Sequence, residues 1–262
     1  MTPREQFITA LAGGQLVFNR NLSKLVRALM VAILAVVFVY ALFRQRDVVS
    51  NWIGVAAVVG TLIWLRIPKQ RWTIVVLVVI ALAIGFPIIY EFAGGEDEWA
   101  ESGGSRLSLI GRVIEVTMRN PITGLGPAAY RPYARMEPLE YRGAYWSIPL
   151  VSSHNNYVDI FSHTGIIGLG IFLWFMVTVA RLAWRLKDRF TTGFLSGYVN
   201  AMFATLVGSA VAMVLADWIL PFIYNIGFPG FQASALVWLF LGGLITLDHL
   251  PDEAKVGVEV AH

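Results

Sequence analysis

Long apolar runs limit this chain to one kind of fold. A helix needs about 20 mainly apolar residues to cross the hydrocarbon core of a bilayer. Six runs approach that length: Leu25–Phe43, Val48–Leu65, Trp72–Tyr90, Gly165–Trp184, Phe194–Ala216 and Phe231–Leu247. Unpaired backbone groups are costly in lipid, so such runs cross as helices. The sequence therefore predicts an all-α polytopic membrane protein with about six transmembrane helices and one large, partly helical loop.

The composition indicates that lipid, rather than water, is the solvent for most of the surface. Apolar residues make up 57% of the chain and charged residues 14%, whereas a soluble domain has about half and a quarter. This excludes a soluble globular protein. The chain has no cysteine, which excludes disulfides and thiolate metal sites. Its net charge of +3 is small, and basic residues scattered over loops indicate membrane topology rather than nucleic-acid binding.

Basic residues in short connections predict the orientation of the spans. With six spans, three basic groups fall on one side: Arg4, Arg20, Lys24 and Arg27; Arg66, Lys69 and Arg71; Arg181, Arg185, Lys187 and Arg189. We assign that side, and both termini, to the cytoplasm. The predicted organisation is three membrane helices over 1–90, an outer loop over 91–164, three helices over 165–247 and a cytoplasmic tail over 248–262. Arg44 and Arg46 then lie outside, against the rule, which suggests a task for one of them at the outer surface.

Two segments of the outer loop have helical signatures. Ser105–Arg119 has apolar residues at helical spacing and is ended by Asn120-Pro121, so it predicts an amphipathic helix that lies at the membrane interface or caps the bundle. The run Ser152-Ser-His-Asn-Asn156 is typical of a helix start, since its side chains can cap free N–H groups. This places His154 at the outer mouth of the fourth span.

An imidazole at this position can accept a proton near neutral pH. From spacing alone, a lone interfacial histidine is more often a hydrogen-bonded polar residue than a catalytic one. His163 lies half a turn out of phase with His154 on a helix, so the two are a poor metal pair. The sequence has no HExxH motif and no carboxylate pair on one predicted span, and so predicts no metal site. Gly165, Gly168 and Gly170 favour close helix packing over a phosphate-binding loop.

Three pieces of the outer segment occur in the order found in a known family. Arg106 opens the helix that ends at Asn120-Pro121. Thr123-Gly-Leu-Gly-Pro-Ala-Ala-Tyr130 is a Gly-x-Gly-Pro turn followed by an aromatic residue, and His154-Asn-Asn-Tyr-Val precedes Gly165-Ile-Ile-Gly168. In register, they resemble the signature region of the O-antigen ligase and polymerase superfamily of bacterial membrane glycosyltransferases. The resemblance covers Arg106–Leu173, about a quarter of the chain.

The resemblance implies a transferase in the inner membrane with its large loop in the periplasm. Such enzymes move a glycan from a polyprenyl diphosphate carrier to another glycan, to lipid A–core or to a protein, without a cofactor or metal. The family's loop arginine corresponds to Arg106 and its loop histidine to His154, which are the catalytic candidates. Guanidinium groups can hold a departing diphosphate, and neutral imidazole can take a proton from an acceptor hydroxyl. We expect Arg106 and His154 to share one outward cavity; the substrate-binding candidates are Arg131, Arg135, Asn155, Arg44 and Arg46.

Three features depart from the family pattern. Asn51 stands where the family has an arginine at the outer start of a span, and Arg44 or Arg46 could replace it. His163 stands where the family has a glutamate. The family has about twice as many spans, and the missing half would precede residue 1. The sequence therefore allows a C-terminal fragment, one half of a split enzyme with an N-terminal partner half, or a reduced, inactive relative.

Two other functions remain open. A non-catalytic membrane subunit would retain the loop without activity. A transporter would place ionisable residues at mid-bilayer; the predicted spans carry essentially none, which ranks transport last. Ligase and polymerase share the loop motifs, so the sequence does not separate them. The expected partners are the lipid-linked glycan, its acceptor and membrane lipids, with no nucleic acid.

Overall fold

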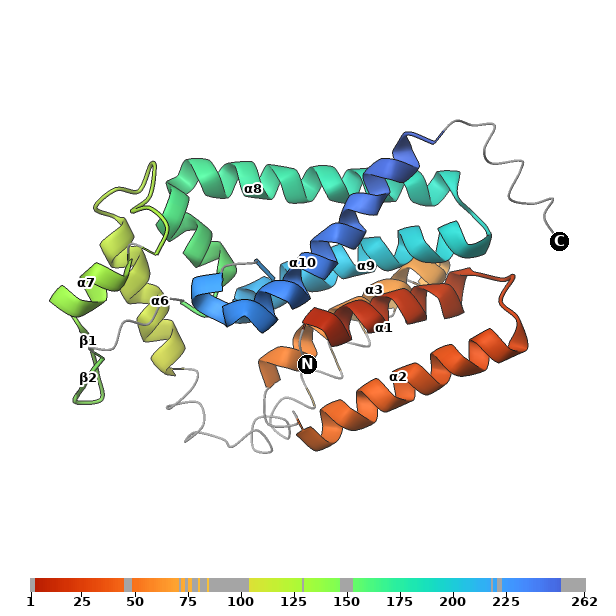
Figure 1. Ribbon diagram of the computed structural model, residues 1–262, viewed down its shortest axis with the longest axis horizontal. Coiled ribbons are helices and arrows are strands. Elements are labelled where there is room, and N and C mark those ends of the chain that lie inside the picture. Colours follow the sequence, from red (N-terminus) through yellow and green to blue (C-terminus); the bar gives the residue numbers. More distant parts are fainter. Residues whose placement is uncertain are drawn as a thin grey trace.

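The computed structural model describes residues 3–44, 49–70, 104–128, 130–146, 153–217, 219–220 and 223–250, together with single positions between 72 and 84. The described elements are α1 (Pro3–Phe18), α2 (Lys24–Arg44), α3 (Val49–Arg66), the short 3₁₀ helix η1 (Pro68–Gln70), α6 (Gly104–Thr117), α7 (Tyr130–Met136), β1 (Leu139–Tyr141), β2 (Ala144–Trp146), α8 (Asn156–Arg189), α9 (Gly193–Leu215) and α10 (Ile223–Asp248). The long helices form an elongated bundle, with α6, α7 and the hairpin at one end (Figure 1).

The predicted all-α membrane fold is confirmed. Within the described residues, four helices are long and apolar enough to cross a membrane: Lys24–Phe43, Asn156–Arg189, Gly193–Leu215 and Gly227–Asp248. They match the first, fourth, fifth and sixth predicted spans, and the shorter apolar helix Trp52–Arg66 lies at the second. The predicted span Trp72–Tyr90 falls mainly outside the described residues, so the number of spans stays a prediction.

Helix α1 was not among the predicted elements. It packs against α3 and α9, with Ala10 and Gln15 buried. Its amides are paired across these contacts: Gln6 Nε2 donates to Ser209 Oγ (3.2 Å), and Gln15 Nε2 donates to the carbonyl of Phe194 (3.0 Å). Hydropathy did not reveal α1 because these buried polar side chains lower its apolar character, while the helices around it satisfy them.

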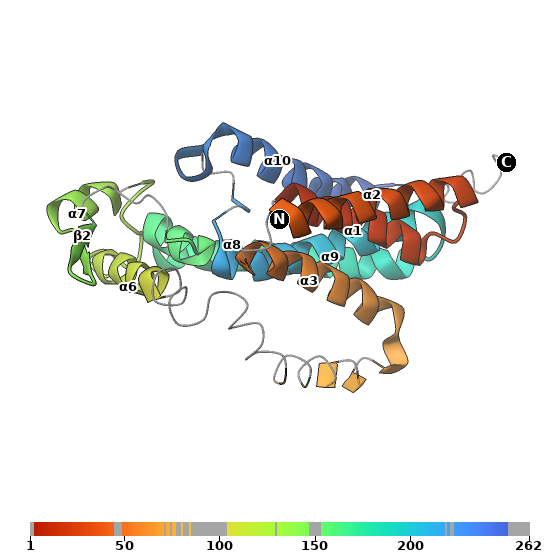
Figure 2. The same cartoon turned by 90° about the horizontal axis from the view of Figure 1, so that it is seen from below.

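The connections at the two ends of the bundle differ in character. The α1–α2 turn, the end of α3 and the α8–α9 turn lie at one end, opposite α6, α7 and the hairpin (Figures 1 and 2). Of the three basic groups, Arg20, Lys24, Arg66, Lys69, Lys187 and Arg189 lie in these connections or at the helix ends beside them, whereas Arg4 lies at the start of α1. That residue is separated from Arg20 by the length of α1, about 24 Å at 1.5 Å per residue. The assignment of the basic end to the cytoplasm stays a prediction.

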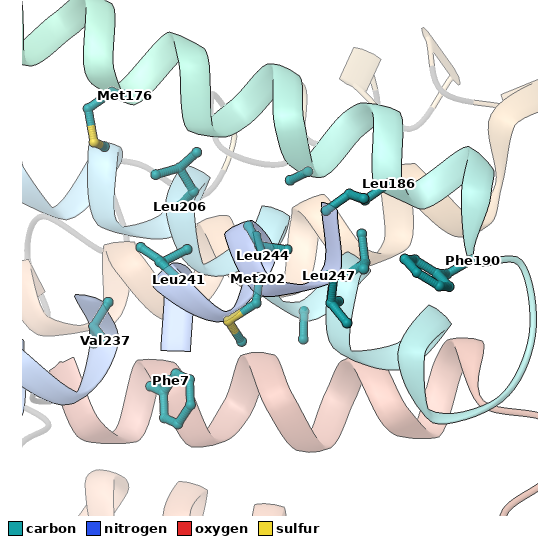
Figure 3. Close-up of a cluster of buried hydrophobic side chains, with 13 residues drawn as sticks. Phe7, Met176, Leu186, Phe190, Met202, Leu206, Val237, Leu241, Leu244 and Leu247 are labelled. Atoms are coloured by element: carbon teal, nitrogen blue, oxygen red, sulfur yellow. The ribbon is translucent and has the colours of Figure 1, made fainter. Parts of the chain in front are cut away.

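The main core lies between α1, α8, α9 and α10 (Figure 3). Its largest members include Phe7, Leu186, Met202 and Leu244, all buried. Many apolar side chains on the outer surfaces of α2 and α8 are exposed, which is the distribution expected where lipid covers the bundle. This rigid bundle holds the start of α8 and the end of α9 in place.

The outer unit, which we define as α6, α7 and the hairpin β1–β2, has a small core of its own. Leu109, Val113 and Val116 of α6 pack against Tyr130 and Ala134 of α7. The amphipathic helix expected over residues 105–119 is therefore present as α6. The antiparallel hairpin pairs residues 139–141 with 144–146 and turns through Arg142 and Gly143, both with positive φ, as expected for a two-residue hairpin loop.

Candidate functional site

The helix start predicted around His154 is confirmed, and Asn155 is its N-cap. The Oδ1 atom of Asn155 accepts hydrogen bonds from the backbone N–H groups of Tyr157 (3.0 Å) and Val158 (3.1 Å). Its Nδ2 atom donates to the carbonyl of Val214 near the end of α9 (2.8 Å). Both polar groups of this side chain are thus engaged in joining α8 to α9.

A buried carboxylate holds the residues before the cap. Asp159 is 2% exposed, and its Oδ1 accepts from the backbone N–H of Ser153 at 2.9 Å. The hydroxyl of Ser153, itself fully buried, lies 2.9 Å from the same oxygen. This arrangement folds the chain back onto the first turn of α8 and leaves little freedom to the residue between Ser153 and the cap.

That residue is His154, which adopts a left-handed backbone conformation with φ of 56°. Residues other than glycine pay about 1–2 kcal/mol for such a conformation, and strained residues of this kind cluster at functional sites. Its Nδ1 atom lies 3.9 Å from Oδ2 of Asp217, which follows α9. The His154 side chain is 43% exposed, while that of Asp217 is 8% exposed. One side of the imidazole therefore faces a buried carboxylate, and 3.9 Å is within ion-pair range but too long for a hydrogen bond.

Asn156 and Tyr157, which follow the cap, complete the junction between α8 and the α9–α10 connection. Asn156 is fully buried, and its Oδ1 accepts from the backbone N–H groups of Ile219 (3.3 Å) and Leu220 (3.4 Å). The hydroxyl of Tyr157 donates to the carbonyl of Ala210 (2.8 Å). Each residue of the motif from His154 to Tyr157 thus contacts the end of α9 or the segment after it, so the motif builds a fixed site where distant parts of the chain meet.

The two glycine motifs form one structural unit. Gly165 interrupts α8 with φ of 66° and ψ of −167°, a combination essentially restricted to glycine. The kink, at the predicted start of the fourth span, frees two carbonyls and two N–H groups from the helix. The turn 121–126 satisfies them: Leu125 N donates to Ser162 O (2.8 Å), Gly126 N to His163 O (3.1 Å), Ile166 N to Pro121 O (2.9 Å) and Ile167 N to Ile122 O (3.4 Å).

The glycines permit this backbone-to-backbone contact. A Cβ on Gly124, whose φ is 76°, would lie 2.5 Å from backbone atoms of Thr164 and Gly165. A Cβ on Gly165 would collide with the carbonyl of Ile122. Close packing, rather than phosphate binding, therefore explains Gly165. Gly170 is different, since a Cβ there would meet nothing within 4 Å among the described residues, so packing within the described chain does not explain that glycine.

Two arginines of the outer unit are committed to an ion-pair network. Arg112 donates to Oε2 of Glu137 at 2.9 Å and to Glu115 at 2.8 Å. Arg119 donates to both oxygens of Glu137 at 2.7 Å and lies over the ring of Tyr133. The hydrogen bond from Arg119 holds the pKa of Glu137 below its ordinary value. These two arginines join α6 to the end of α7 and are poorly placed to bind a substrate phosphate.

The other candidate arginines lie apart from this network. Arg131 and Arg135 line an open hollow of about 530 Å³ together with Ala128, Pro132 and Met136. Arg106, half-buried in the first turn of α6, makes no hydrogen bond or ion pair with the described residues. Neither Arg106 nor His154 lines that hollow. A single cavity shared by Arg106 and His154 therefore stays a prediction.

One replacement considered for the missing family arginine, Arg44, lies at the end of a helix. Arg44 ends α2, and Asn51 lies in the first turn of α3. Both of these helix ends face the end of the bundle that carries the outer unit (Figure 1). Arg46 lies outside the described residues.

Two carboxylates of the site were not predicted from the sequence: Asp159 was not noticed, and Asp217 was given no role. Asp159 had a signal, since an acid in the first turn of a helix is favourable, whereas Asp217 had none because it is distant in sequence.

Within the described residues, no group of three or more His, Asp or Glu side chains could hold a metal ion.

Comparison with known protein families gives a match. Residues 24–173, more than half of the sequence, match the model of the O-antigen ligase family. The matched region begins with α2, contains the outer unit and both glycine motifs, and ends within α8. Searches of curated proteins and of solved structures found no match.

Proposed function

Because this chain belongs to the O-antigen ligase family, we propose that it transfers a glycan from a polyprenyl diphosphate carrier to an acceptor at the periplasmic face of the inner membrane. The observation that carries this proposal is His154, held in a strained conformation beside the buried Asp217. Residues in strained backbone conformations cluster at active sites and ligand-binding sites, and here the strained residue carries an imidazole next to a buried carboxylate.

In the proposed reaction, an acceptor hydroxyl oxygen attacks the anomeric carbon of the donor sugar, and the bond from that carbon to the diphosphate oxygen breaks. The imidazole of His154, 43% exposed, takes the hydroxyl proton, and polyprenyl diphosphate leaves as an anion. Asp217 is assigned the role of attracting the positive charge that forms on the ring, since opposite charges near 4 Å attract each other. Asn155, with both polar groups engaged, is assigned a positioning role here rather than the substrate contact expected from sequence.

Arg106, Arg131 and Arg135 are assigned to the anionic donor. Arg106 is proposed to hold the diphosphate, since a guanidinium stays cationic and offers a planar fork to phosphate oxygens. Arg131 and Arg135, one helical turn apart on the hollow of α7, are proposed to contact the glycan or its phosphate. Arg44 or Arg46 is proposed to supply the charge that Asn51 lacks.

Arg106→Ala is expected to weaken binding of the donor lipid, while Arg106→Lys restores it only in part because an ammonium lacks the fork. Loss of one charge-assisted hydrogen bond corresponds to about 1.5–3 kcal/mol, or roughly 10- to 100-fold in affinity. Equilibrium binding of radiolabelled donor lipid to the reconstituted protein measures this. Arg112→Ala is a matched control on the same helix, because Glu137 retains Arg119 as a partner. Unchanged donor affinity in Arg106→Ala would remove Arg106 from the donor site.

Asp217→Asn is expected to lower the transfer rate about tenfold and leave donor binding unchanged. The amide keeps the shape of the side chain and removes the charge. A tenfold lower rate corresponds to a barrier that is higher by about 1.4 kcal/mol. The attraction between two unit charges 4 Å apart is about 1 kcal/mol in water and about 4 kcal/mol near a protein surface, so the expected loss lies between these values. Single-turnover rates at saturating donor measure this. A wild-type rate in Asp217→Asn would show that its charge has no part in the reaction.

A cell-surface glycan profile with and without the gene tests the proposed function itself. Loss of long polysaccharide with short units retained indicates a polymerase, and loss of glycan attached to the lipid core indicates a ligase. An unchanged profile, also after co-expression with any upstream membrane partner half, would favour the second candidate, a non-catalytic subunit. The observation in favour of that candidate is Asn51, which stands where the family's arginine is expected.

A further inference from the structure

The outer unit exposes a row of apolar side chains on α6. Leu107 and Met118 are each 59% exposed and Ile114 is 37% exposed. Met118 directly follows the last residue of α6, and its backbone N–H still donates to Ile114 as in a helix. The spacing of seven and four residues therefore places all three side chains on one face. The opposite face, with Leu109, Val113 and Val116, is buried against α7 and the start of α8. Ile122, just beyond the helix and 59% exposed, extends the row. We call Leu107, Ile114, Met118 and Ile122 the α6 stripe.

The α6 stripe is continuous with the lipid-facing surface of α8. The backbone of Ile122 accepts a hydrogen bond from Ile167, and Pro121 accepts one from Ile166. Ile166 and Ile167 are 57% and 52% exposed and begin a surface of exposed apolar residues that runs down α8. Ile122 thus joins two apolar surfaces that belong to different parts of the chain.

The kink of α8 also marks the expected border of the hydrocarbon core. From Ile166 to Arg185, α8 rises about 28 Å at 1.5 Å per residue, close to the thickness of about 30 Å of a bilayer core. Helix α6 lies just beyond the kink and runs across the long axis of the bundle (Figure 1). A helix in this position lies along the membrane surface, where an amphipathic helix buries its apolar face among lipid headgroups and upper acyl chains.

We propose that the α6 stripe is a membrane-contact surface that anchors the outer unit in the interface of the bilayer. Lipid covers the stripe in continuity with the surface of α8. Arg106, adjacent to Leu107 at the start of the helix, is then held at the level of the lipid phosphates. This last consequence rests on the proposed function, because it brings Arg106 to the depth at which the diphosphate of a lipid-linked donor lies.

Spin labels on single cysteines test the proposal, and the chain has no cysteine of its own to remove. The full chain carrying Ile114→Cys or Met118→Cys is labelled with a nitroxide and reconstituted in vesicles of phosphatidylethanolamine and phosphatidylglycerol. Glu115→Cys is the matched control, since Glu115 is adjacent to Ile114 and its side chain is 69% exposed. We expect collisions with lipid-soluble oxygen to dominate at 114 and 118, and collisions with a water-soluble nickel chelate to dominate at 115.

Two results would overturn the proposal. Nickel collisions that dominate at all three positions would show that water covers the stripe. Low accessibility to both reagents at 114 and 118 would show that protein covers it, from a second copy or another subunit. Because this readout requires no turnover, an inactive protein with oxygen-accessible labels would count against the proposed function alone, leaving the membrane contact intact.

Discussion

His154→Ala is expected to lower the transfer rate by about 10²–10⁴ while the donor lipid still binds. The reason is that a well-placed general base contributes this factor to a proton transfer, whereas neutral histidine anchors phosphate poorly. The assay is single-turnover transfer with any required partner half present, beside equilibrium donor binding. Wild-type turnover in His154→Ala would remove the histidine from the mechanism.

His154→Gly separates a catalytic role from a structural one. Glycine adopts a φ of 56° without strain, so the substitution relieves about 1–2 kcal/mol of backbone strain. We expect the rate to fall as in His154→Ala, while the melting temperature of the purified protein stays at or above that of the wild type. A clear drop in melting temperature would show instead that the imidazole holds the junction of α8 and α9 together.

Gly165→Ala is expected to destabilise the protein by about 2–6 kcal/mol, a large part of the 5–15 kcal/mol that typically separates folded from unfolded protein. A backbone conformation restricted to glycine costs a larger residue about 1–3 kcal/mol, and overpacking costs about the same again. The added methyl would strike the carbonyl of Ile122 and expel the turn 121–126 from the kink. Thermal unfolding in detergent and the yield of monodisperse protein measure the effect.

Gly170→Ala is the matched control, five residues further along α8. A Cβ at this position meets nothing within 4 Å, and alanine is favoured over glycine inside a helix by about 1 kcal/mol. We expect no loss of stability. Equal melting temperatures for Gly165→Ala and Gly170→Ala would show that α8 can straighten without cost and that the turn 121–126 is not needed to stabilise it.

Features that depend on a few neighbouring residues were predicted correctly from the sequence. The apolar runs predicted the membrane fold and six spans, four of which are present as long helices among the described residues, because each long helix must itself be apolar where it meets lipid. The cap at Asn155 and the amphipathic character of α6 followed in the same way from short-range spacing. The order of the loop motifs predicted the family, which the match over residues 24–173 confirmed.

Features that depend on residues distant in sequence required the tertiary structure. Helix α1 is stable because α9 accepts hydrogen bonds from its buried amides while α3 packs beside it, which no local apolar pattern reveals. Asp217 reaches His154 only because the end of α9 packs against the start of α8. Likewise, Glu137 separates the paired Arg112 and Arg119 from the other loop arginines. Spacing along the chain predicts which residues share one face of a helix. Packing of the helices decides which side chains come into contact, and ion pairs and hydrogen bonds form only between groups that are in contact.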